Sequence, residues 1–430
     1  MVRQLVSGIN KDTNMSLLKF EDKKDKIVFL VGCFATFYVA LVGRVYVGEL
    51  IVFFLYLTKS EIRKVRLPKP VKKINTLLKI WLVSAIISDL YRGIPTIDML
   101  KGVVSILFLM SLIPFVYWSL YDKISRWKYF FFGTVISSQL TYYLLTATTE
   151  FGSTEIWKVY SFVPLFSGIA VLFYYKGKHN LSYLTFFLFG IWVLFNGSRN
   201  VFITSVMTVF FLCVVNKTNS NSIQTSISRY KKNAVLIFFS LAIGLSIVDV
   251  GYEYLASNHY LGEKAYEKYY RQKNSKQGLA SGRLEAIMAA ELIKESPIIG
   301  YGSFAKDRTN FVYNYYRTNG YEIKPGGRWD ADEDSVENML PRHSRIFGTW
   351  MWHGIGCGIF WISILLLFYR VVKSGCLLLE PRLLALSFFT LFTEIWDTFF
   401  SIMSVRLVPL FFWIFCILIY EKYKSQLHTA

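Results

Sequence analysis

About twelve long apolar blocks constrain the fold of this 430-residue chain more than any other feature of its sequence. Most blocks have about 17–22 residues with few charges, the length that an α-helix needs to cross about 30 Å of hydrocarbon. Because the backbone must satisfy its own hydrogen bonds in a membrane, helices are the expected structure. Only 18% of the residues are charged, whereas soluble domains have about 25%. The sequence therefore predicts an all-α, polytopic membrane protein; a large soluble α protein is the alternative.

The expected spans define three regions: spans 1–9 in residues 1–250, a large loop in 251–349, and spans 10–12 in 350–430. The second span is short enough to be re-entrant. The twelve expected spans are 27–43, 45–58, 75–90, 101–120, 129–148, 160–175, 181–196, 200–216, 233–250, 350–369, 382–400 and 405–420.

Basic residues are distributed unevenly over the segments between the spans. With the N-terminus inside, the inside segments hold about 27 Lys and Arg residues and the short outside loops about 6. Cytoplasmic loops carry such an excess of Lys and Arg, so both termini are expected in the cytoplasm. The net charge of +19 is largely explained by this topology, and nucleic acid is rejected as a partner. The basic run Lys59–Lys73 is expected to lie against anionic membrane lipids.

The loop 251–349 is expected outside, and a loop of this length usually carries function or its own structure. Its first part, "EYLASNHYLGEKAYEKYYRQKNSK", is basic and rich in tyrosine, which fits either anchoring at the lipid headgroups or contact with sugars and phosphates. Its second part, "SGRLEAIMAAELIKESPIIGYG", predicts a helix with Ser281 as its N-cap. Pro297 ends this helix, and Gly300 and Gly302 predict a tight turn.

Two arginines in outside segments are candidate anion-binding residues. Arg199, in "FNGSRNVF", lies at a tight turn before a helix start; it either extends to the membrane interface or forms an anion site with Ser198 and the helix N-terminus. Arg283 lies near the start of the loop helix, where a positive charge is unfavourable to the helix dipole. Glu285 is too close in sequence to share a helix face with it, so an anionic ligand is the favoured explanation.

His343 lies just before the tenth expected span, between Arg342 and Arg345. A lone histidine is often structural, but one at a membrane–water boundary can exchange a proton near neutral pH. His343 is therefore the candidate general base. His353, ten residues later within the apolar block, is expected to pack or to hydrogen-bond to another helix.

The acidic residues are weaker candidates. The segment Asp330–Asp334 resembles a metal-binding run, but it lacks the glycine and closing glutamate of a calcium loop. It is expected to be solvated, and no metal or other cofactor is predicted. Glu394 and Asp397 lie near the end of the eleventh expected span. Since carboxylates in membranes are costly and often functional, they are secondary candidates, with Arg199 or Arg406 as expected partners.

Three of these segments together resemble the O-antigen ligase and O-antigen polymerase superfamily of bacterial transferases. "GSRN" resembles its Ser-Arg motif, "SGRLEAIMAAELIKESPIIGYG" its arginine, loop helix and Pro-x-x-Gly-x-Gly, and "RHSRIFGTWMWHGIGCGIF" its histidine before a Gly-Ile turn. The motifs cover roughly Gly197–Phe360; elsewhere only the hydropathy agrees. Many members have His-Asn where this chain has His343-Ser344. The resemblance implies a glycosyltransferase architecture of the GT-C-like kind, in the inner membrane, with a periplasmic site.

The resemblance also implies the substrate: a glycan on undecaprenyl pyrophosphate. In this interpretation Arg199 and Arg283 bind the pyrophosphate, and His343 is the base or a further phosphate donor. Arg342, Arg345 and Tyr301 are further substrate-binding residues. The expected reaction inverts the anomeric carbon without a metal. The polymerase, which joins lipid-linked repeat units, is favoured over the ligase, whose acceptor is lipid A-core. A chain-length regulator protein is a further expected partner. A flippase for the same lipid and a non-catalytic assembly partner are the remaining alternatives.

Overall fold

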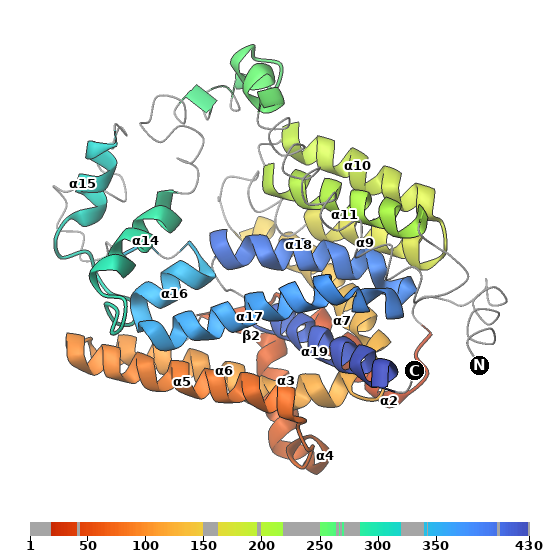
Figure 1. Ribbon diagram of the computed structural model, residues 1–430, viewed down its shortest axis with the longest axis horizontal. Helices are drawn as coiled ribbons and strands as arrows, with labels where there is room; N and C mark the ends of the chain where they lie inside the picture. The colour runs from red at the N-terminus through yellow and green to blue at the C-terminus, as the bar shows by residue number, and fades with distance from the viewer. Residues whose placement is uncertain are drawn as a thin grey trace.

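The structure of the protein is a computed structural model, which describes residues 19–40, 44–148, 162–195, 199–217, 250–263, 266, 269–270, 284–319, 339–341, 343–401 and 405–428. In this part the chain is mostly helical, with a small two-stranded antiparallel sheet near its N-terminus (Figure 1). The chain is thus an all-α protein in its general architecture, as the sequence predicts.

The elements before the large loop are mainly long helices. They are α2 (Lys23–Cys33), β1 (Tyr38–Ala40), β2 (Arg44–Tyr46), α3 (Val47–Thr58), α4 (Ser60–Arg63), α5 (Lys69–Arg92), α6 (Thr96–Leu120), η2 (Ile124–Arg126), α7 (Trp127–Thr148), α9 (Val163–Tyr175), α10 (His179–Phe195) and α11 (Arg199–Lys217).

The elements of the large loop and the C-terminal part are also helical. They are α14 (Leu284–Glu295), α15 (Phe311–Thr318), α16 (Arg345–His353), α17 (Ile355–Ser374), η5 (Cys376–Leu379), η6 (Pro381–Leu383), α18 (Leu384–Phe400) and α19 (Leu407–His428).

Four helical segments are long and apolar enough to cross a membrane: Lys69–Arg92, Thr96–Leu120, Ile355–Ser374 and Pro381–Phe400. Four shorter apolar helices, α3, α9, α10 and most of α11, accompany them. The outer faces of α5 and α6 carry exposed apolar residues, among them Ile80, Val83, Ile87, Val104 and Leu107. Such faces suit contact with lipid tails. The structure therefore supports a membrane protein; it does not confirm twelve spans.

Two of the expected spans are wrong as continuous helices. The helix in the expected span 27–43 ends at Cys33, and residues Tyr38–Ala40 of this span form strand β1, which pairs with β2. The expected span 350–369 is interrupted at Gly354, whose φ of 71° separates α16 from α17. Because α16 begins at Arg345, the expected boundary between loop and membrane at residue 349 falls inside a helix. Of the expected span 233–250, residues 233–249 lie outside the described residues.

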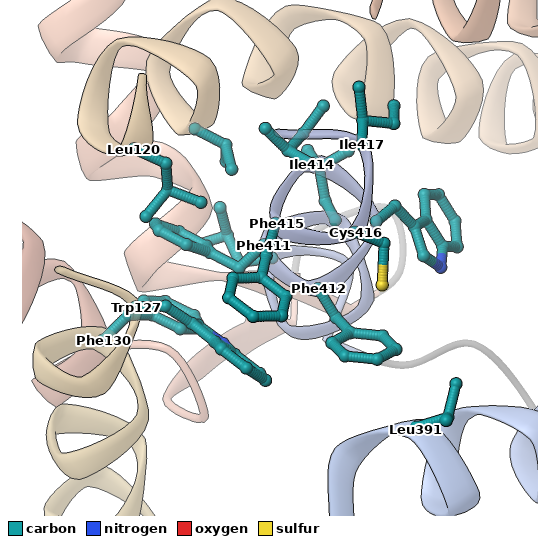
Figure 2. Close-up of a cluster of buried hydrophobic side chains, with 14 of the residues drawn as sticks. Leu120, Trp127, Phe130, Leu391, Phe411, Phe412, Ile414, Phe415, Cys416 and Ile417 are labelled. Atoms are coloured by element: carbon teal, nitrogen blue, oxygen red, sulfur yellow. The ribbon is translucent and has the colours of Figure 1, made fainter. Parts of the chain in front are cut away.

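Helix α19 lies at the centre of the helical packing. Its residues from Leu410 to Cys416 are buried on every side of the helix, as expected for a helix that is apolar all round. The ring of Phe411 stacks on Phe130 of α7 with centroids 3.9 Å apart, and Phe415 lies 4.4 Å from Trp127. Figure 2 shows this cluster around α19. A helix so enclosed fixes the relative positions of its neighbours.

Helices α14 and α15 of the large loop lie at one end of the molecule (Figure 1). Figure 1 shows α14 beside α16, with α15 next to α14, at the end of the molecule where α5 also terminates. Helix α14 packs on α16 through Ala289 and Leu292, which form a cluster with Met351 and Trp352. This packing places the motif residues of the loop next to those that begin the C-terminal helices.

Candidate functional site

Two of the sequence motifs, about fifty residues apart, interlock through their backbones. The turn after α14 bonds to the end of α16: Tyr301 N donates to Met351 O, and Gly302 N donates to Trp352 O, both at 2.8 Å. In return, Ile355 N donates to Ile298 O at 2.9 Å. The Pro-x-x-Gly-x-Gly motif and the Gly-Ile turn are therefore parts of one structure.

Glycine is required at two positions of this interlock. Gly354 has φ of 71°, and a Cβ atom there would lie 2.0 Å from Ile298 O. Gly300 has φ of 82°, and a Cβ atom there would lie 2.6 Å from Trp352 O. Both the left-handed backbone and the close approach of the opposing carbonyl exclude larger residues. The glycines in the motifs thus hold the loop against the end of α16.

Arg92, at the end of α5, holds the same turn from the other side. Its Nε donates to Gly300 O and its guanidinium to Ser296 Oγ, both at 2.8 Å. The guanidinium carbon also lies 5.0 Å from the ring centre of Tyr301. The Tyr301 hydroxyl donates to Glu295 at 2.7 Å; burial and this carboxylate raise the pKa of Tyr301. The side chain of Tyr301, which is expected from the sequence to bind substrate, thus contacts Arg92 and Glu295 within the turn.

A buried chain of polar groups links the turn to α5. Trp81 Nε1 donates to His353 Nδ1 at 2.9 Å, and His353 Nε2 lies 3.0 Å from Ser303 Oγ. The Ser303 hydroxyl donates to Asp89 at 2.8 Å, and its backbone N–H donates to the same carboxylate. All four side chains are buried. His353 makes the hydrogen bond between helices that the sequence favours.

His343 lies at the opposite end of α16 from His353 and is differently placed. Its side chain is 46% exposed, and its Nδ1 pairs with the carboxylate of Glu285 in the first turn of α14. The next residue, Ser344, caps α16 by accepting a hydrogen bond from Phe347 N at 3.0 Å. The side chain of His343 is therefore half-exposed. Its pairing with Glu285 and the helix cap at Ser344 fix its position.

Arg345 is buried and paired with two carboxylates of α18. Its guanidinium contacts Glu394 at 2.7 Å and Asp397 at 3.0 Å. The expectation that Arg406 pairs with these two acids is wrong, because Arg406 pairs with Glu49 of α3 at 2.9 Å. The side chain of Arg199, the other expected partner, lies outside the described part. With a side chain only 7% exposed and both terminal nitrogens engaged, Arg345 anchors the start of α16 to α18. This placement does not suit the direct substrate contact expected of Arg345.

The other candidate arginines are less completely described. Arg199 is the first residue of α11, as the expected helix start requires, but its side chain lies outside the described part. Arg283 and Arg342 lie outside the described residues. In the sequence, Arg283 directly precedes Leu284, where α14 begins, and Arg342 directly precedes His343. The chain thus carries an arginine within two residues of each member of the His343–Glu285 pair.

The sequence does not predict several residues of the site region as functional residues. Glu285 was considered only as a partner of Arg283, and the helix spacing argued against that pair. Asp89, Ser303, Trp81 and Arg92 belong to segments that are distant in the sequence, so no local pattern connects them. A carboxylate within the apolar run "WLVSAIISDLYR" was an available signal for Asp89, since a carboxylate in such a run requires a partner.

Within the described ranges, no group of three or more His, Cys, Asp or Glu side chains is arranged to hold a metal ion. The acidic segment Asp330–Asp334 lies outside those ranges. Comparison of the chain with protein-family models and with curated proteins found no match.

Proposed function

We propose that this chain is a membrane-embedded glycosyltransferase that uses a glycan carried on undecaprenyl pyrophosphate. The observation that carries the proposal is the His343–Glu285 pair: a half-exposed imidazole just before α16, held by a carboxylate in the first turn of α14 in the large loop. The adjoining helices are apolar enough to lie in a membrane. A substrate with a lipid tail and a polar glycan requires such a boundary, with the tail among the helices and the sugars at the loop.

In the proposed reaction, His343 accepts the proton of an acceptor hydroxyl as its oxygen attacks the anomeric carbon of the donor. The bond from that carbon to the pyrophosphate oxygen breaks, and undecaprenyl pyrophosphate leaves with the electron pair. Arg199 and Arg283 bind the pyrophosphate, where guanidinium groups stabilise the growing negative charge. Attack opposite the leaving group inverts the anomeric configuration. Arg342 is a further phosphate contact in this scheme.

The remaining residues act indirectly. Arg345 anchors α16 through Glu394 and Asp397, and Tyr301 and Arg92 hold the turn after α14. In our proposal the site faces the periplasm and both termini lie in the cytoplasm of a bacterial cell. Contacts between segments assigned to one side support this: Arg126 pairs with Asp22, and Arg92 contacts Gly300.

Within this class we propose the polymerase reaction, in which the acceptor is a second lipid-linked repeat unit. The ligase reaction uses the same donor chemistry with lipid A-core as the acceptor, so the two differ in the product. A flippase or an assembly partner would use neither the base nor the pyrophosphate-binding arginines. A single experiment can therefore separate the polymerase, the ligase and the functions without glycosyl transfer.

The experiment is complementation of a strain that lacks the protein, with surface polysaccharide resolved on a gel. The variants are Arg283→Ala and His343→Ala, with Lys294→Ala on the exposed face of α14 as the control. We expect both site variants to reach the membrane and to lose the ladder of long glycans, while the control keeps it. A core bearing one repeat unit supports the polymerase; a bare core with long glycans on the carrier lipid indicates the ligase. An unchanged ladder in both variants contradicts glycosyl transfer through these residues.

A further inference from the structure

We infer that Glu285 is a positioning residue that sets which nitrogen of His343 faces the acceptor. The inference rests on the proposed function, since it concerns the base of that reaction. A carboxylate offers hydrogen-bond acceptors only, so the imidazole nitrogen that contacts it must carry a hydrogen. Because Nδ1 is the nitrogen that contacts Glu285, the neutral ring carries its hydrogen there. Nε2 is then left with a lone pair that can accept a proton.

The placement of Glu285 is determined by the packing of α14. Leu284 and Met288 of this helix are buried against Val312, and Ala289 and Leu292 pack in the cluster that includes α16. Glu285 itself lies in the first turn of the helix, where a negative charge is favourable to the helix dipole. Its side chain is 23% exposed. The carboxylate is therefore held on a fixed element rather than on a free loop.

The contact with Glu285 holds the imidazole ring of His343 in one orientation, which the ring would not keep by itself. A histidine without a partner on Nδ1 can exchange its hydrogen between the two nitrogens and turn about its side-chain bonds. A base must lie within hydrogen-bonding distance of the proton that it accepts. In this arrangement Glu285 fixes the hydrogen and the ring plane together, and Nε2 is the atom that receives the proton of the acceptor hydroxyl.

The test compares three variants in purified protein in detergent. Glu285→Ala removes the acceptor, Glu285→Gln keeps an oxygen acceptor without the charge, and Glu291→Ala is the matched control on the same helix, where Glu291 pairs only with the surface Lys294 among the contacts described for it. The first readout is the ¹⁵N NMR spectrum of labelled histidines, with the His343 signals identified by their loss in His343→Ala. The second is the rate of undecaprenyl pyrophosphate release from a lipid-linked repeat unit.

We expect wild type, Glu285→Gln and Glu291→Ala to hold the hydrogen of neutral His343 on Nδ1, and Glu285→Ala to move it towards Nε2. A general base contributes about 100- to 10,000-fold to a rate, so misplacing it in Glu285→Ala is expected to lower kcat about 10- to 100-fold with little change in KM. Glu285→Gln should fall between Glu285→Ala and wild type.

The outcomes separate the inference from the proposed function. If His343→Ala is inactive but Glu285→Ala keeps both the wild-type tautomer and the wild-type kcat, Glu285 does not position the base and the proposed reaction stands. If His343→Ala itself keeps the wild-type rate, the proposed role of His343 fails, and the positioning role fails with it. A loss of activity in Glu285→Ala with an unchanged tautomer likewise overturns the inference, because the effect then does not pass through the ring.

Discussion

The hydroxyl oxygen of Ser303 lies 3.0 Å from Nε2 of His353. The Ser303 side chain packs between α5, α6 and the end of α16. Ser303 belongs to the large loop, while His353 ends a helix of the C-terminal part. Because Trp81 can only donate, it fixes Nδ1 of a neutral His353 as an acceptor, which leaves the hydrogen on Nε2. His353 then donates to Ser303, and Ser303 donates to Asp89. One buried chain of hydrogen bonds thus attaches the loop to the helical body.

The first prediction concerns this attachment. Ser303→Ala removes the acceptor for His353 and one of the donors to Asp89, both of which are buried. Leaving a buried polar group without its partner costs about 1–3 kcal/mol, so the melting temperature in detergent should fall. Ser257→Ala, at an exposed site, is the control and should leave the melting temperature unchanged. Equal melting temperatures for the two variants would show that the chain of hydrogen bonds does not hold the loop.

The second prediction compares two glycines of positive φ, one inside the interlock and one outside it. Gly354 and Gly177 have nearly equal φ values of 71° and 72°, but only Gly354 has an opposing carbonyl within reach of a Cβ atom. Gly177→Ala should cost about 1–2 kcal/mol, the usual cost of a left-handed residue other than glycine. Gly354→Ala should lower stability more and release the loop. The measurement is thermal unfolding together with limited proteolysis of the loop; equal losses in the two variants would exclude the interlock.

Sequence reasoning identified the helical class and the segments that form the interlock, because apolar length and the Gly and Pro positions are local signals. The turn at Gly354 is indicated only by the family resemblance; by hydropathy "HGIGCGIF" is as apolar as a continuous span, so the sequence predicts 350–369 as one helix. Sequence reasoning did not find the partners of His343, His353 and Arg345. Those partners lie on α14, α5 and α18, and only the packing of distant segments brings them together.

The third prediction concerns the buried charges of α16. Arg345→Ala would leave Glu394, which is 2% exposed, without its cationic partner. Breaking a buried ion pair from one side costs about 3–5 kcal/mol, so the variant should be strongly destabilised or accumulate poorly. Lys294→Ala, which removes an exposed pair with Glu291, should change stability by at most about 1 kcal/mol. Chemical unfolding in detergent compares the two, and similar effects would contradict the anchoring role of Arg345.

The fourth prediction concerns acid sensitivity near the start of α7. Burial alone would raise the pKa of Asp22 and of Asp122, but the hydrogen bonds and charge of Arg126, with the backbone N–H of Asp25 for Asp22, lower both below 3.8. Groups with a lowered folded-state pKa stabilise the fold above their unfolded pKa and lose this contribution as the pH falls through the folded value. Stability should therefore decline below about pH 4.

The variant that tests this is Asp22→Asn combined with Asp122→Asn. It should be less stable than wild type at neutral pH, but it should lose less stability between about pH 5 and about pH 3, because the two titrating groups are gone. The measurement is the unfolding midpoint in detergent as a function of pH. An acid dependence as steep as that of wild type would assign the effect to other carboxylates.

The most direct test of the account is the reaction of purified protein with a synthetic undecaprenyl-pyrophosphate-linked repeat unit, in the presence of EDTA. We expect wild type to release undecaprenyl pyrophosphate and to form glycans of two or more repeats on the carrier lipid, with an inverted linkage. We also expect His343→Ala and Arg283→Ala, at wild-type levels of folded protein, to form neither product. Product formation by the two variants at the wild-type rate would contradict the assignment of the site. If wild type forms no product from this substrate, with or without lipid A-core, the proposed reaction is wrong.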